Sequence, residues 1–144
     1  MNQVGNTSEN TSEPWRTAVG GFTVCNASEL AQLLPACALE LNADVHTVDL
    51  RAATDAAQAM MILSKRLRFP EYFGQNLDAL YDMTGECADI AQGRLDIQID
   101  AVPHIWLIYS TVEQAEVLSP VLDAMRDAMD GFKGTALSIL WVVV

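Results

Sequence analysis

The chain has 144 residues, with 8 Lys and Arg against 19 Asp and Glu, and therefore a formal net charge of −11 at pH 7. Its 51% of apolar residues is enough to fill the core of one domain of this length, which argues against a disordered chain and against a multidomain enzyme. A surface this acidic repels a polyanion, because proteins grip phosphates with Lys and Arg, and we expect no direct binding to nucleic acid.

The first fourteen residues are a polar segment, in which Asn-Thr-Ser-Glu occurs twice in succession. Such a segment has little apolar surface to bury, so we expect a disordered tail at residues 1–14. The remaining residues, 15–144, are expected to form a single domain.

A strand and a helix are predicted to open this domain. Residues 22–25 have the composition of a short strand, and Ser28 stands at a plausible N-cap position for a helix over residues 29–41. Pro35 lies within that helix and should break or kink it, because proline lacks a backbone donor. We treat residues 15–44 as a strand and helix added before the main part of the domain.

The main part, residues 45–144, begins with a second strand and a second helix. Residues 45–50 alternate in the manner of a strand, and Thr54 is the predicted cap of a helix over residues 55–67. Cations near the end of a helix complement the negative pole of its dipole. The end of this helix collects three basic residues, Lys65, Arg66 and Arg68.

A further helix is predicted over residues 76–83, after Pro70 has ended the one before it. Phe73, Leu77 and Leu80 recur at i, i+4 and i+7, the spacing of one helix face. We expect this apolar stripe to face the core.

Two buried strands are predicted in the last part of the chain. Residues 104–109 (HIWLIY) form an unbroken apolar run that suits a strand buried on both faces of a parallel sheet, and residues 137–144 (LSILWVVV) form a β-branched run that should be another buried strand. Between them, helices are predicted over residues 112–118 and 120–130, the second with Pro120 at its first position. Strands separated by helices predict an α/β fold, with a small parallel sheet of about three strands packed with helices.

Cysteine usage and the terminal sequence indicate a location. Cys25, Cys37 and Cys87 form no Cys-x-x-Cys pair and have no histidine at zinc-site spacing, which favours a reducing compartment. The N-terminal residues lack the features of a secretion signal, and no run of 18 apolar residues occurs. We expect a cytoplasmic protein that does not enter a membrane.

Acidic residues are concentrated in the second half of the chain, where residues 71–130 hold twelve acids and two bases. Asp78, Tyr81 and Asp82 share an outer face of the predicted helix, although like charges at i and i+4 repel. Three interpretations fit this face: a solvated surface, a carboxylate pair for acid–base or hard-metal chemistry, and a ridge that binds a partner protein. The absence of a third carboxylate or histidine at a matching spacing counts against a metal.

A motif within this region resembles a known family. Residues 69–82, Phe-Pro-Glu-Tyr-Phe-Gly-Gln-Asn-Leu-Asp-Ala-Leu-Tyr-Asp, closely resemble the signature of the barstar family, small intracellular inhibitors that block a cognate secreted ribonuclease. The order of the surrounding elements agrees, so the resemblance covers about residues 45–144. It implies a barstar-like fold and a protein inhibitor rather than an enzyme.

The resemblance also implies which residues bind the partner. In that family the helix after a Gly-x-Asn turn enters the nuclease active site, where acidic side chains take the place of RNA phosphates. By position, this role falls to Asp78 and above all to Asp82. The full partner-binding set implied is Tyr72, Phe73, Asn76, Asp78, Tyr81, Asp82, Thr84, Gly85 and Asp127.

The chain departs from the family pattern near this helix. Tyr81 stands where the family usually has Trp, and Glu86 stands where an aromatic contact would be expected. The connection over residues 86–103 is longer than in the family, and residues 94–99 within it predict an extra strand or loop.

These features together predict an immunity protein or antitoxin with no catalysis, no cofactor and no metal. Its partner would be a cognate basic ribonuclease toxin of a bacterial competition system, bound as a 1:1 complex. Two alternatives come from other classes. The chain could be a small metal-dependent hydrolase that uses Asp78 and Asp82, or a general acidic scaffold that binds basic proteins.

Overall fold

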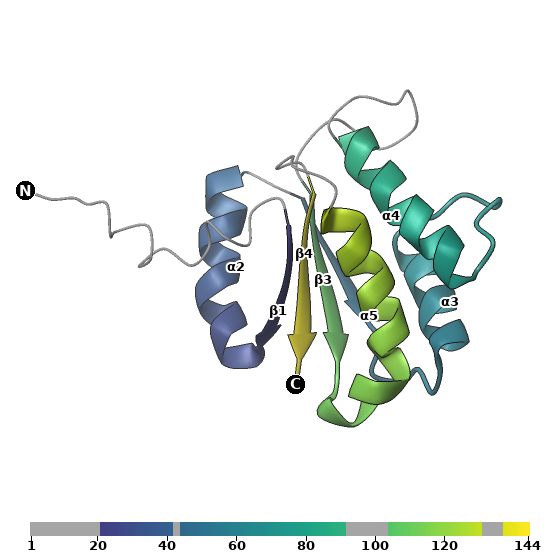
Figure 1. Cartoon of the computed structure of the whole chain (residues 1–144). Coiled ribbons are helices and arrows are strands. Elements are labelled where there is room, and N and C mark those ends of the chain that lie inside the picture. Colours follow the sequence, from purple (N-terminus) through teal and green to yellow (C-terminus); the bar gives the residue numbers. More distant parts are fainter. Residues whose placement is uncertain (1–20, 42–43, 92–103, 131–136) are drawn as a thin grey trace, which may run out of the picture.

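A parallel sheet of four strands forms the centre of the computed structural model, which describes residues 21–41, 44–91, 104–130 and 137–144 (Figure 1). The strands are β1 (Phe22–Asn26), β2 (Asp44–Asp49), β3 (His104–Ser110) and β4 (Leu137–Val143). They lie in the order β1-β4-β3-β2, and every neighbouring pair is parallel. The predicted α/β class is confirmed, and the predicted N-terminal strand joins the sheet as a fourth strand.

Helices cover both faces of this sheet. One face carries α2 (Ala27–Leu41), and the other carries α3 (Ala56–Arg66), α4 (Leu77–Ala91) and α5 (Ala115–Asp130) (Figure 1). A short 3₁₀ turn, η3 (Val112–Gln114), joins β3 to α5. Within the described ranges, no helix combines the length and the apolar character that crossing a membrane requires.

β3 contributes to two cores, because successive side chains of a strand point to opposite faces. Trp106 and Ile108 lie in the core beneath α3, α4 and α5, whereas Ile105 and Leu107 lie in the core beneath α2. Every residue of β3 except Tyr109 is buried. The expectation of a strand buried on both faces is therefore confirmed for residues 104–109, and β4 behaves in the same way.

The cap of α2 differs from the prediction. Asn26 accepts a hydrogen bond from the Glu29 backbone N–H at 2.8 Å, and the Glu29 carboxylate accepts one from the Asn26 N–H at 2.9 Å. This reciprocal pair satisfies two N–H groups that the helix leaves unbonded, so the helix begins two residues before the start predicted from Ser28. Pro35 lies inside the helix and does not end it. The proline leaves the Ala31 carbonyl without its helical donor, but both residues are exposed, so this carbonyl is not confined to the core.

The start of α3 is capped by Asp55 rather than by Thr54. The Asp55 carboxylate accepts a hydrogen bond from the Gln58 N–H at 2.8 Å. A carboxylate is a stronger acceptor than a hydroxyl and also complements the positive end of the helix dipole. The Gln58 side chain in turn accepts a hydrogen bond from the Thr54 N–H at 2.9 Å, which completes the cap.

A single helix, α5, replaces the two helices predicted over residues 112–130. Pro120 lies inside α5 instead of at the first position of a helix. Its missing N–H would have bonded the Glu116 carbonyl, and the Ser119 hydroxyl donates to that carbonyl at 3.2 Å instead. The helix therefore continues through the proline, and Leu118, Val121 and Met125 form its buried stripe as predicted.

We predict that Ser110→Ala lowers the free energy of unfolding by about 1 to 3 kcal/mol, because it leaves the buried indole N–H of Trp141 without an acceptor. The indole N–H of Trp141 donates to the Ser110 hydroxyl at 2.8 Å, and both residues are buried. Urea denaturation at pH 7 measures the change. Ser28→Ala, at an exposed serine, is the control and should leave the midpoint unchanged; equal midpoints for the two variants would contradict the assignment.

Candidate functional site

The loop before α4 fixes where this helix begins. Gln75 adopts a left-handed conformation with a φ of 53°, and Asn76 follows as the cap. The Asn76 side-chain carbonyl accepts a hydrogen bond from the Ala79 N–H at 2.8 Å. Asn76 belongs to the predicted partner-binding set, and its side chain serves here to start the helix.

Aromatic packing holds the same loop against the sheet. The Phe73 ring lies 5.1 Å from the Phe69 ring, which in turn lies 6.2 Å from Trp106 on β3 (centroid to centroid). Phe73 is buried, so its side chain supports the loop from the inside and is not accessible to a partner.

The buried face of α4 extends further than the sequence predicted. The helix continues to Ala91 rather than ending at residue 83, so later residues share its inner face. Leu77 is 38% exposed and is not part of the stripe predicted with Phe73 and Leu80. The error arises because Phe73 lies before the helix, where helical spacing does not apply. Over residues 77–88 of α4, for which burial is described, the buried residues are Leu80, Met83, Thr84, Cys87 and Ala88.

The opposite face of α4 presents Asp78, Tyr81 and Asp82, all exposed. The two carboxylates are one helical turn apart, and Tyr81 stands between them with 47% of its surface exposed. Among the residues that the structure describes, neither carboxylate has a hydrogen-bond or ion-pair partner. This face therefore offers two acceptors whose charge is not balanced within the described protein.

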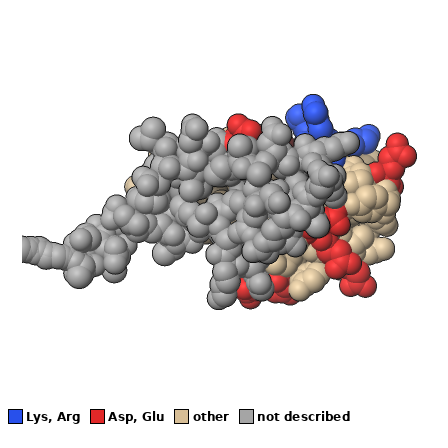
Figure 2. Space-filling view, turned by 90° about the horizontal axis from the view of Figure 1, so that it is seen from above, with Lys and Arg blue, Asp and Glu red and all other residues tan. Residues whose placement is uncertain are grey.

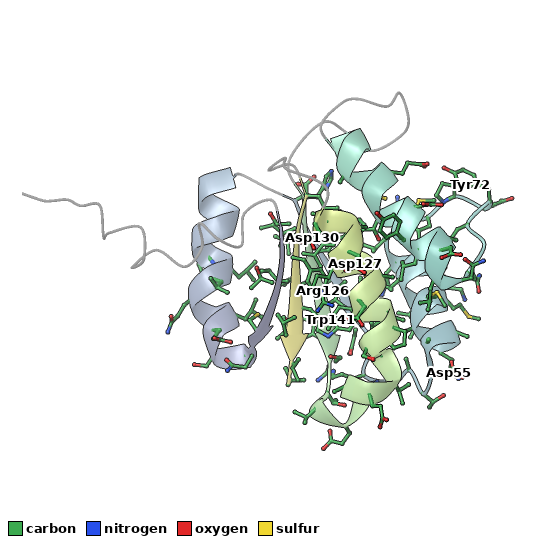
Figure 3. All side chains as sticks on the ribbon, viewed as in Figure 1. Asp55, Tyr72, Arg126, Asp127, Asp130 and Trp141 are labelled. Carbon is green, nitrogen blue, oxygen red and sulfur yellow. The ribbon has the colours of Figure 1, made fainter. Side chains whose placement is uncertain are left out.

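Tyr72 lies on the loop beside this face and is 66% exposed (Figure 3). Its hydroxyl donates a hydrogen bond to the Glu86 carboxylate. This bond is the main reason that the pKa of Tyr72 lies above its ordinary value, with desolvation and the Glu86 charge adding to it. Glu86 follows Asp82 at i+4 but was not among the predicted binding residues, since the helix was expected to end at residue 83 and in fact continues to Ala91.

Thr84 and Gly85 occupy different environments within α4. Thr84 is fully buried, so its side chain is not accessible to a partner molecule, and its hydroxyl has no hydrogen-bond partner among the residues that the structure describes. Gly85 is half-buried, and a Cβ built on it would meet no atom within 4 Å. The helix thus leaves open space beside its backbone one turn after Asp82.

Asp127 lies on α5, the helix that packs against α4. Figure 3 shows it with Arg126 and Asp130 on the same helix. The Arg126 guanidinium pairs with Asp123 at 2.7 Å, so the nearest base on α5 is already engaged. Asp127 is exposed and has no partner within the described ranges.

The described charges are unevenly distributed. Seen from above, the basic side chains gather at one edge of the visible face, whereas acidic side chains recur around the rest of it (Figure 2). Arg51 is paired with Asp49 at 2.8 Å, which leaves Lys65, Arg66 and Arg68 at the end of α3 as an exposed basic group. A cationic partner therefore meets an acidic surface at α4.

The described residues show neither an activated thiol at Cys87 nor a cluster of metal ligands. Burial, with a smaller contribution from the Glu86 charge, raises the pKa of Cys87 to about 12, which keeps this thiol protonated at neutral pH. In the described part of the chain, no group of three or more His, Cys, Asp or Glu side chains is placed to hold a metal ion. The alternative of a metal-dependent hydrolase gains no support from this geometry.

Comparison with known proteins gives one family match. The model of the family described as "Barstar (barnase inhibitor)" matches residues 43–143, a stretch that includes the loop, α4 and α5. No curated protein gives a match.

We predict that Thr84→Val raises the free energy of unfolding by about 1 kcal/mol, because valine has nearly the same shape and removes an unsatisfied buried hydroxyl. Thermal or urea unfolding measures the change. Thr47→Val, at an exposed position of β2, is the matched control, and we expect little effect there. A loss of stability in Thr84→Val would show that the hydroxyl has a partner in solution.

Proposed function

The chain belongs to the barstar family, and we propose on this premise that it is an immunity-type inhibitor which blocks a cognate toxic ribonuclease with the exposed face of α4. The observation on which this proposal rests is the pair Asp78 and Asp82, exposed, one turn apart and unpaired within the described residues. A ribonuclease must present cations to bind RNA phosphates. Carboxylates held at that site form charge-assisted hydrogen bonds with the same cations and exclude the substrate.

Three features support this use of α4. The cap at Asn76 and the buried face around Leu80 fix the helix before binding, which lowers the entropy lost on association. Tyr72 and Tyr81 add exposed aromatic surface beside the carboxylates, and aromatic residues are enriched at the centres of interfaces. The acidic surrounding surface accelerates the approach of a basic partner.

We assign the contacts to six members of the family-implied set that are not fully buried: Tyr72, Asp78, Tyr81, Asp82, Gly85 and Asp127. Asn76 is exposed as well, but its side chain is engaged in the cap of α4. Glu86 joins them through its bond to Tyr72. Phe73, Asn76 and Thr84 then act indirectly, by holding the loop and the helix. We further propose that the complex is 1:1, that it forms in the cytoplasm, and that the toxin belongs to a bacterial competition system.

A capture experiment tests the proposal. We expect immobilised wild-type protein to retain a basic nuclease from a lysate of its own cells, and the Asp78→Ala/Asp82→Ala variant to retain none. Glu113→Ala/Glu116→Ala removes two exposed acids elsewhere, so it loses the same charge and should still capture. In the isolated complex, Asp82→Ala should raise Kd by roughly 10- to 150-fold, the loss of one charged hydrogen bond.

If both acidic double variants behave like the wild type in the capture experiment, α4 is not the binding surface. If both lose the same basic proteins equally, the chain is an acidic scaffold whose binding depends on net charge, because a specific site requires a difference between them.

We predict opposite effects of Gly85→Ala on stability and on binding. The new Cβ meets nothing within 4 Å in the free protein, so alanine should stabilise the helix by about 0.5 to 1 kcal/mol. In the complex the same methyl group occupies the space where the partner approaches the helix backbone, so Kd should rise. Urea unfolding and a binding titration measure the two effects, and an unchanged Kd would mean that the partner makes no contact at Gly85.

A further inference from the structure

The two histidines of the chain face each other at the N-terminal end of the sheet. His46 lies on β2 and His104 is the first residue of β3. The His46 Nε2 and the His104 Nδ1 are 2.9 Å apart, and the ring centroids are 5.0 Å apart. His46 is half-buried and His104 is buried, so their contact is partly shielded from water.

The contact limits how many protons the pair can hold. A hydrogen bond between two imidazoles needs a donor N–H on one ring and a lone pair on the other. A protonated imidazole has two N–H groups and no free lone pair at nitrogen, so the bond survives one added proton and is lost with the second. Two protonated rings at this distance also repel each other.

The described surroundings of His46 add to this effect. Burial lowers the pKa of His46 below its ordinary value of 6.5, and His104 and Arg68 lower it further. Asp44, on the same strand, acts in the opposite direction. Arg68 approaches from the loop after α3, so the described groups that face His46 are two bases and one acid.

The pair adjoins the loop that positions the proposed binding helix. Trp106 is the register partner of His46, and Phe69 packs on Trp106 at 6.2 Å. Arg68 starts this loop in a left-handed conformation, with a φ of 56°, which an arginine adopts at some cost. The loop continues to Tyr72 and to the cap of α4. Its first residues therefore reach the surroundings of His46, through the charge of Arg68 and the packing of Phe69 on Trp106, and its last residues adjoin the proposed binding face.

We propose that the His46–His104 pair is a proton-sensitive switch, in which the second protonation breaks the pair and loosens the loop at residues 67–76. The proposal concerns the free protein. Only its consequence for binding, an altered position of Tyr72 and α4, rests on the proposed function.

The sign of the pH dependence follows from the surroundings. Because the pKa of His46 is lower in the folded protein than in the unfolded chain, its contribution to stability is complete above about pH 6.5. It is lost as the pH falls from there toward the folded-state pKa. Each pKa unit by which folding lowers the pKa of His46 corresponds, once the pH has fallen below the folded-state pKa, to about a tenfold fall in the ratio of folded to unfolded protein. Asp49, whose pKa Arg51 holds at about 2, stays charged throughout this range.

An NMR titration of the wild-type free protein from pH 8 to pH 5 tests the proposal. The chain has 2 histidines, so every imidazole signal belongs to the pair. We expect two coupled protonation steps, the second displaced to lower pH because burial and the neighbouring ring disfavour a charge on His46, and backbone amide shifts of residues 67–76 that follow the second step. Two independent titrations near pH 6.5 overturn the proposal, as do loop amides that do not respond to the second step.

A second measurement uses unfolding in urea at pH 7.0 and at pH 5.5. The matched variants His46→Gln and His104→Gln cannot accept the proton, and each should lose less stability over this interval than the wild type. An equal loss in all three proteins contradicts the switch. Neither experiment contains a partner, so a failed switch leaves the capture result unaffected, and a failed capture leaves the titration unaffected.

Discussion

The burial of β3 on both faces is the constraint on which the rest of the fold depends. A strand with Ile105 and Leu107 on one side and Trp106 and Ile108 on the other needs a covering layer on each side of the sheet. α2 supplies one layer, and α3, α4 and α5 supply the other. The N-terminal strand and helix are therefore structural members of the domain, since they cover apolar side chains of β3 and β4. Within the layer of three helices, α4 has an exposed face that carries Asp78, Tyr81 and Asp82.

α4 combines features that favour stability with features that oppose it. Its inner face packs into the core through Leu80 and Ala88, and Asn76 caps it. Its outer face holds repelling carboxylates at Asp78 and Asp82, and its interior holds a glycine and an unsatisfied threonine hydroxyl. Residues that lower stability are retained mainly where they serve a function. Several such residues on one helix are therefore typical of a binding site.

The sequence predicted the strands and the fold class well, because long apolar runs such as residues 104–109 have few alternatives to a buried strand. Helix boundaries were less predictable. Asn26 and Asp55 cap helices whose caps were expected at Ser28 and Thr54. The Ser119 hydroxyl bonds a carbonyl that Pro120 leaves without its N–H, so the helix continues where a new one was expected to begin. The acidic residues of the candidate site, Asp78 and Asp82, were predicted from the motif at residues 69–82. The bonds Tyr72–Glu86 and His46–His104 join residues 14 and 58 positions apart, and no local spacing encodes such contacts.

The position of β1 decides which strand edges of the described sheet are open to pairing with another chain. An open strand edge invites pairing with another chain, and β4, rich in β-branched residues, would be a favourable template for such pairing. β1 occupies that edge over five residue pairs, from Phe22 with Ile139 to Asn26 with Val143. At the other side of the described sheet, the outer strand β2 begins with Asp44 and ends with Asp49, both exposed. Two like strands brought edge to edge there would place aspartates against aspartates, so charge disfavours pairing at the β2 border. At the other border the short strand β1, and not the apolar β4, is the outer strand.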